Sequence, residues 1–167
     1  MSSAPLMTVP VTPSIRSRLT AEESLLRKVL LGCLVAAQGA VGAAEAGAVL
    51  GWPLEQTEAV TAALVAKKLV VQDDQDRVKY AYPVSSVSTS HRVTLDDGRT
   101  LHAMCAIDAL GCFFEFGQPL QIDAQCYVCG APVHVTVRSE TEVASLPPDV
   151  YATHVDLNKY DDWAAST

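Results

Sequence analysis

The chain has 167 residues, of which 49% are hydrophobic and 19% are charged, and its formal net charge is −7. This length is enough for one ordinary domain, or for two small domains that share a core, and no apolar run approaches the ~20 residues that a membrane-spanning helix needs. Neither half carries the basic stripe that nucleic-acid binding requires, and the second half, from Tyr82 on, has four basic and eleven acidic residues. We therefore expect neither a nucleic-acid nor a membrane partner.

Residues 1–13, MSSAPLMTVPVTP, are rich in Ser, Thr and Pro and lack the basic start and long apolar stretch of a signal peptide. We expect them to form a disordered arm of a cytoplasmic protein. The five cysteines agree with that compartment, because thiols in a chain without an export signal serve chemistry or metal binding more often than disulfides.

Residues 14–83 have the pattern of three helices followed by a hairpin. Thr20 and Glu23 form a capping-box pattern before apolar residues at helical spacing, which predicts a helix over about 21–37. Two further helices are predicted over residues 43–51 and 54–68. A pair of strands around a polar turn is predicted over residues 68–83.

This order of elements is typical of a winged-helix domain, whose best-known use is reading DNA. The third predicted helix, however, begins with Glu55 and Glu58 and offers only Lys67 and Lys68 at its end. A structural or dimerising role is therefore favoured over DNA binding.

The remaining residues, 84–167, begin with a strand pattern at His91–Leu95 and a turn signal at Asp97-Gly98, so a second strand or a helix follows. The run MCAIDALGCFFEF, residues 104–116, is predicted to be a helix. On a helix, residues three and four apart share a face, so one stripe contains Cys105, Asp108 and Cys112.

A carboxylate rarely enters an apolar face without a partner, whereas a buried cysteine can be purely structural. The helix N-terminus is expected to help Cys105 ionise, and burial beside a negative sulfur favours the protonated form of the Asp108 carboxyl. A thiolate next to a proton donor is suited to cleaving a bond at a soft centre.

A second pair of cysteines, Cys126 and Cys129, lies between two predicted strands and has the spacing of a metal or redox pair. A closed zinc site needs four ligands, so others would have to come from a distance: Cys105, Cys112, His134 or His154. A bound metal ion, a dithiol without metal and ordinary burial all remain open at this point.

Three blocks resemble the organomercurial lyase (alkylmercury lyase, MerB) family in the same order: HRVTLDDGRTLHAMCAIDAL, QIDAQCYVCGAPVHVTV and THVDLNKYDDWA. The resemblance covers about residues 15–165. It implies an α+β fold in which a winged-helix-like domain, 14–83, precedes a MerB-like mixed sheet and helix domain, 84–167, that is catalytic or metal-binding.

The activity that the resemblance implies is protonolytic cleavage of a carbon–mercury bond in a small organometallic substrate. In the family, two cysteine thiolates capture the organomercurial and an aspartate delivers the proton, without an organic cofactor. Cys105 and Asp108 match the first catalytic cysteine and the aspartate, and Cys126 matches a cysteine regarded as structural.

The chain departs from the family at the second catalytic cysteine, which precedes a His-Val pair. Alignment on His154-Val155 places Ala152 or Thr153 there, so the chain resembles a divergent member that lacks this thiol. Cys129 is the first candidate to replace it and Cys112 the second. The predicted ligands of a thiol-bound mercury, copper or zinc ion are Cys105, Cys129 and Cys126.

Three hypotheses follow from these residues. A divergent alkylmercury lyase would release hydrocarbon from an organomercurial. An enzyme of the same fold recruited to other lyase chemistry in a biosynthetic pathway would only be inhibited by one. A non-catalytic thiol metal-binding protein would take up stoichiometric metal without turnover.

Overall fold

The computed structural model describes residues 18–152; the predicted arm at 1–13 and His154 lie outside the described residues. The helices are α1 (Ala21–Ala37), α2 (Ala43–Leu50), α3 (Leu54–Ala66) and α4 (Ala106–Phe116). The strands are β1 (Val41–Gly42), β2 (Val70–Gln72), β3 (Arg77–Ala81), β4 (Val84–Ser85), β5 (His91–Leu95), β6 (Thr100–Ala103), β7 (Leu120–Gln125), β8 (Pro132–Val137) and β9 (Val143–Leu146). This mixed composition confirms the predicted α+β class.

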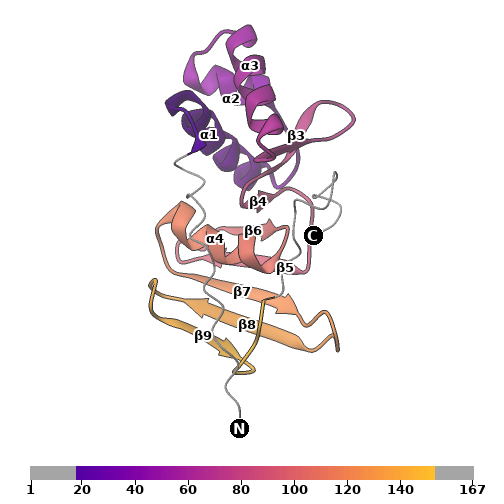
Figure 1. The fold of residues 1–167 in the computed structure, drawn as a ribbon, viewed down its shortest axis with the longest axis vertical. Coiled ribbons are helices and arrows are strands. Elements are labelled where there is room, and N and C mark those ends of the chain that lie inside the picture. The colour runs from indigo at the N-terminus through magenta and orange to yellow at the C-terminus, as the bar shows by residue number, and fades with distance from the viewer. Residues whose placement is uncertain (1–17, 153–167) are drawn as a thin grey trace.

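Figure 1 shows α1, α2 and α3 gathered at one end of the molecule, with the strands stepping away from them and α4 lying against the sheet. Within residues 18–152 the nine strands form one antiparallel sheet in the order β1-β3-β4-β6-β5-β7-β8-β9, and β2 pairs with β3. Strand β4 joins the two halves, because Val84 pairs with Ala81 of β3 and Ser85 pairs with His102 of β6. The sheet therefore runs without interruption across the predicted domain boundary at residue 83.

The helices and the longer strands agree with the sequence-based expectations. The helix over 21–37 is confirmed, as are the strand at His91–Leu95 and the hairpin of β2 and β3, and β6 shows that a strand follows the Asp97-Gly98 turn. The sequence analysis missed β1, β4 and β9, which are short. No helix in the described part of the chain combines the length and apolar character needed to cross a membrane.

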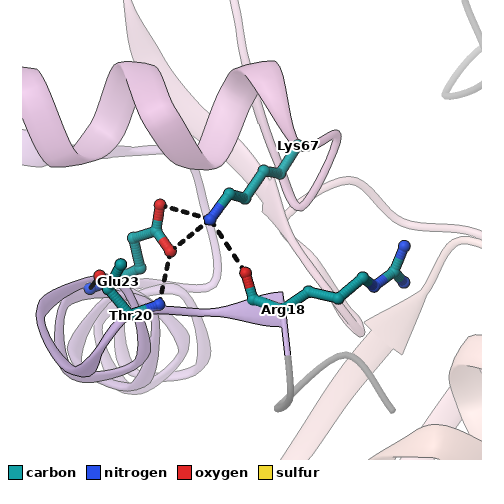
Figure 2. A network of polar contacts seen from close by, with 4 residues as sticks. All are labelled: Arg18, Thr20, Glu23 and Lys67. Carbon is teal, nitrogen blue, oxygen red and sulfur yellow. Dashed lines mark hydrogen bonds and ion pairs between the residues drawn. The ribbon is translucent and has the colours of Figure 1, made fainter. Parts of the chain in front are cut away.

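The start of α1 is tied to the end of α3 by a polar network (Figure 2). The predicted capping box is present: Glu23 N donates to Thr20 Oγ1 at 3.2 Å, and Thr20 N donates to Glu23 Oε2 at 2.7 Å. Lys67 Nζ donates to the two Glu23 carboxylate oxygens at 2.7 and 2.6 Å and to Arg18 O at 2.9 Å. The hydrogen bond from Lys67 holds the pKa of the Glu23 carboxyl below its usual value of 4.5.

This network predicts a pH-dependent contribution to stability. A carboxyl whose pKa is lower in the folded state stabilises the fold above its unfolded pKa, and that contribution is lost as the pH falls through the folded value. We expect Glu23→Gln, whose amide can still complete the capping box, to be less stable than the wild type by about 1 kcal/mol at pH 7, since Lys67 is partly exposed. Thermal unfolding followed by circular dichroism should show this difference shrinking below pH 4.5. A difference that stays constant from pH 7 to pH 3 would refute the assignment.

Helices α2 and α3 are in close contact at Gly47. A Cβ at this position would lie 2.1 Å from Oγ1 of Thr57, which is 1% exposed and donates through the same hydroxyl to Pro53 O at 3.0 Å. We expect Gly47→Ala to lower the free energy of unfolding by about 1–3 kcal/mol, because the added methyl group overpacks a buried contact.

A matched control exists on α1, where a Cβ at the exposed Gly32 would meet nothing within 4 Å. Gly32→Ala should raise the free energy of unfolding by about 0.5–1 kcal/mol, since alanine has the higher helix propensity. Urea denaturation compares the two variants. Equal responses to both substitutions would contradict the close approach at Gly47.

Candidate functional site

The N-terminus of α4 brings together the two residues that the sequence analysis selected as catalytic. Cys105 is the N-cap, with φ −145° and ψ 174°, because β6 delivers the chain in an extended conformation. Its sulfur accepts a hydrogen bond from Asp108 N at 3.4 Å. Asp108 and Cys112 are both buried on the same face of α4, so the predicted stripe is present.

The Asp108 carboxyl group points into the interior rather than to the surface. It is 7% exposed, and its Oδ2 accepts a hydrogen bond at 3.0 Å from the hydroxyl of Tyr80, which is 1% exposed. Tyr80 comes from β3 in the first half of the chain, and the sequence analysis did not select it. Strand alternation could have placed Tyr80 inside, but not opposite α4.

A second tyrosine, Tyr82, completes the surroundings of the site. A Cβ at Gly111 on α4 would lie 2.9 Å from the Tyr82 hydroxyl, so a larger residue at this position would require the hydroxyl end of Tyr82 to shift. Burial raises the pKa of Tyr82 to about 12, and negative charge on Asp108, Cys105 and Cys112 adds to the shift. The Tyr82 hydroxyl therefore shares one enclosed polar cluster with the stripe on α4.

Burial decides the protonation state of the Cys105 sulfur. Loss of hydration raises the pKa of Cys105 to about 11, with the Asp108 charge as a second cause, whereas the backbone N–H groups of Asp108 and Ile107 lower it. The helix N-terminus thus acts in the direction expected from the sequence, but burial is the larger effect. At neutral pH the resting group is a thiol.

Cys112 is placed poorly to share a ligand with Cys105. It is 0% exposed, and burial raises its pKa strongly. Seven residues separate the two cysteines, which corresponds to about 10 Å along a helix axis. Cys112 therefore belongs to the packed interior beneath the site.

Arg27 connects α1 to the later part of α4. This α1 residue donates to the Tyr82 carbonyl oxygen and forms an ion pair of 2.6 Å with Glu115 near the end of α4, with side-chain exposures of 2% and 9%. Both the partner helix and Tyr82 are therefore fixed by one buried guanidinium group. No sequence pattern marked Arg27, since its partners lie 55 and 88 residues away.

The two other candidate cysteines occupy the turn between β7 and β8. Cys126 N donates to Ala131 O and Gly130 N donates to Cys126 O, both at 2.8 Å, and Gly130 has φ 71°. Hydrogen bonding from the backbone of Cys129 and Val128 and from the Cys129 side chain lowers the pKa of Cys126. Cys126 is half-buried and Cys129 is exposed.

The register of the sheet places Cys105 and Cys126 at the same end. Ala103 of β6 pairs with His91 of β5, and Asp123 of β7 pairs with the next β5 residue, so β6 and β7 run in the same direction with β5 between them. His102 and Asp123 both pair with Arg92 of β5, and each cysteine follows three residues after this level. Two strand spacings, about 10 Å, separate β6 from β7 at this level.

The candidate residues therefore form two separate pairs: Cys105 lies beside Asp108, and Cys126 lies beside Cys129. Among residues 18–152, no three His, Cys, Asp or Glu side chains are gathered to hold a metal ion. His134, a possible further ligand from the sequence, is exposed and pairs with Asp123 at 2.6 Å.

Comparison with known proteins finds similarity to alkylmercury lyases. The alkylmercury lyase of Staphylococcus epidermidis is 33% identical over 97 residues, which are 58% of this chain and 43% of that protein. The alkylmercury lyase of Bacillus cereus is 29% identical over 98 residues, 59% of this chain and 42% of that protein. The chain thus spans less than half the length of these relatives.

A solved structure, the mercury-bound form of MerB2, superposes with a TM-score of 0.63 at 25% identity and covers 78% of this chain and 63% of its own. The model of the alkylmercury lyase family, MerB, matches residues 84–167, which are half of the sequence and include α4 and both pairs of groups. The chain therefore belongs to the alkylmercury lyase family.

Proposed function

We propose that this chain cleaves the carbon–mercury bond of small organomercurial compounds by protonolysis, with Cys105 binding mercury and Asp108 delivering the proton. The observation that carries the proposal is the pairing of a thiol and a carboxyl group one helical turn apart in an enclosed site, where Asp108 is 7% exposed. Membership of the alkylmercury lyase family supports the choice of substrate class.

In the first step, the Cys105 sulfur bonds to the mercury atom of R–Hg–X, the ligand X leaves as an anion, and the thiol proton passes to the Asp108 carboxylate. In the second step, Asp108 gives this proton to the carbon atom as the carbon–mercury bond breaks. The hydrocarbon R–H leaves, and mercury(II) remains on the Cys105 sulfur. No oxidation state changes and no organic cofactor takes part.

The raised pKa of Cys105, about 11, fits this sequence of proton transfers. Because the resting group is a thiol, binding of mercury releases a proton inside the site rather than in solution. Asp108 lies one turn away to receive it, and the Tyr80 hydroxyl holds the carboxyl group in place at 3.0 Å. General acid catalysis needs such a donor within reach of the departing carbon.

Mercury(II) prefers two sulfur ligands, and the proposed further ligands, Cys129 and Cys126 in the turn between β7 and β8, bind it only after the carbon–mercury bond has broken. Cys112 is the weaker candidate, because it is 0% exposed and belongs to the packed interior. Cys129 is exposed, and the turn lies at the same end of the sheet as Cys105.

For the first half of the chain we propose a structural role as a winged-helix-like domain over 14–83, ahead of the MerB-like domain over 84–167. The order α1, α2, α3 and then the hairpin of β2 and β3 supports this assignment. Its contribution to the site is positional, since Tyr80 and Arg27 reach across to Asp108 and Glu115 of α4.

The proposed function is tested by incubating the purified chain with phenylmercury and excess small thiol and measuring benzene by gas chromatography. We expect more than one equivalent of benzene per chain. Stoichiometric mercury uptake without benzene would instead identify a thiol metal-binding protein, the second candidate, which is favoured by the position of Cys126 and Cys129 in one tight turn.

A further inference from the structure

We propose that Cys126 and Cys129 form a two-sulfur acceptor site that removes mercury(II) from Cys105 after the hydrocarbon has left. The inference rests on the proposed function. It states that the turn binds the product, mercury(II), and does not bind the organomercurial substrate. It assigns the chemical step to Cys105 and Asp108 alone.

The geometry of the turn is suited to a soft, two-coordinate ion. Cys126 and Cys129 are held three residues apart in one tight turn, in which Gly130 N donates to Cys126 O and Cys126 N donates to Ala131 O, both at 2.8 Å. Thiolate sulfur selects soft metals, and linear S–Hg–S coordination needs only two such ligands. The lack of a three-ligand group among the described residues is therefore no obstacle to mercury binding here.

The position of the turn is suited to product release. Tyr127 and Val128, between the two cysteines, are 101% and 91% exposed, so the turn projects into solvent, whereas Cys105 is half-buried beside Asp108, which is 7% exposed. Figure 1 shows the β7–β8 hairpin reaching beyond the neighbouring strands. An ion held by the exposed Cys129 is more open to attack by an external thiol than one held by the half-buried Cys105.

Chelation by two sulfurs favours the transfer of mercury(II) from Cys105 to the turn. A single sulfur holds mercury(II) at Cys105, whereas the turn offers two sulfurs whose second bond is intramolecular and therefore strongly favoured. In the exchange, the Cys126 sulfur and then the Cys129 sulfur bond to mercury and the Cys105–mercury bond breaks; one of the two thiol protons ends on the Cys105 sulfur and the other passes to solvent. No electron is transferred and no co-reactant is needed.

The test compares Cys126→Ser/Cys129→Ser with the wild type, with Cys33→Ser on α1 as the matched cysteine control. With phenylmercury in excess and small thiol limiting, the double variant should release a first equivalent of benzene at the wild-type rate and then slow at least tenfold. Cys33→Ser should follow the wild type throughout. Loss of the first equivalent in the double variant would overturn the proposal, because the turn would then take part in substrate capture.

A second measurement separates this proposal from the proposed function. The Cys105→Ser variant is titrated with mercuric chloride, and binding is followed by the ultraviolet absorbance of the sulfur–mercury bond. We expect this variant to bind one mercury ion tightly. The triple variant that also carries Cys126→Ser and Cys129→Ser should not bind this ion. Retention of that ion would overturn the acceptor site. Absence of benzene from the wild type would overturn the proposed function, while the titration still reports whether the turn binds mercury.

Discussion

Cys105→Ser is expected to abolish benzene release from phenylmercury, with a loss on the order of a thousandfold or more in rate. The reason is chemical: the serine hydroxyl is a hard, weakly acidic ligand that does not bond to mercury, so the substrate is not captured. The fold should be unaffected, because serine is among the best N-cap residues and its oxygen can accept the bond that Cys105 Sγ takes from Asp108 N. Benzene release and thermal unfolding, measured on the same preparation, check both halves of the prediction.

Asp108→Asn provides the matched comparison within the site. The asparagine preserves size and can still accept a hydrogen bond from Tyr80, but it cannot carry the proton from sulfur to carbon. This variant should bind one equivalent of phenylmercury at Cys105 and release benzene far more slowly than the wild type. Wild-type rates from either variant would show that the chemistry lies elsewhere in the chain.

The features of the fold that the sequence predicted are those set by local spacing. Thr20 and Glu23 start α1 because capping needs only neighbours three residues apart. The shared face of Cys105, Asp108 and Cys112 likewise follows from helical geometry alone. The two-residue strands β1 and β4 escaped notice, because a pair of residues carries no alternation to detect.

The features that could not be predicted depend on contacts between distant segments. Tyr80 meets Asp108 across 28 residues and Arg27 meets Glu115 across 88, so neither pair leaves a spacing signature. The protonation of Cys105 belongs to the same class. The local helix N-terminus predicted easier ionisation, whereas burial, a property of the whole fold, raises the pKa to about 11.

The buried Arg27–Glu115 pair yields the prediction with the largest effect on stability. Arg27→Met should lower the free energy of unfolding by about 3–5 kcal/mol, because it leaves the Glu115 carboxylate, 9% exposed, without its counter-ion. The Tyr82 carbonyl oxygen loses its donor at the same time. Urea denaturation at neutral pH, followed by circular dichroism, measures the loss.

The double variant Arg27→Met/Glu115→Leu separates the ion pair from general damage to packing. Removing both charges should restore much of the stability that Arg27→Met loses, because no unpaired charge remains buried. Arg138→Met offers a surface comparison, since the Arg138–Glu142 pair at 2.8 Å is 65% and 60% exposed and its removal should change stability little. If the double variant is no more stable than Arg27→Met, the guanidinium group contributes through its shape and its bond to Tyr82, and the orientation of α4 does not depend on charge.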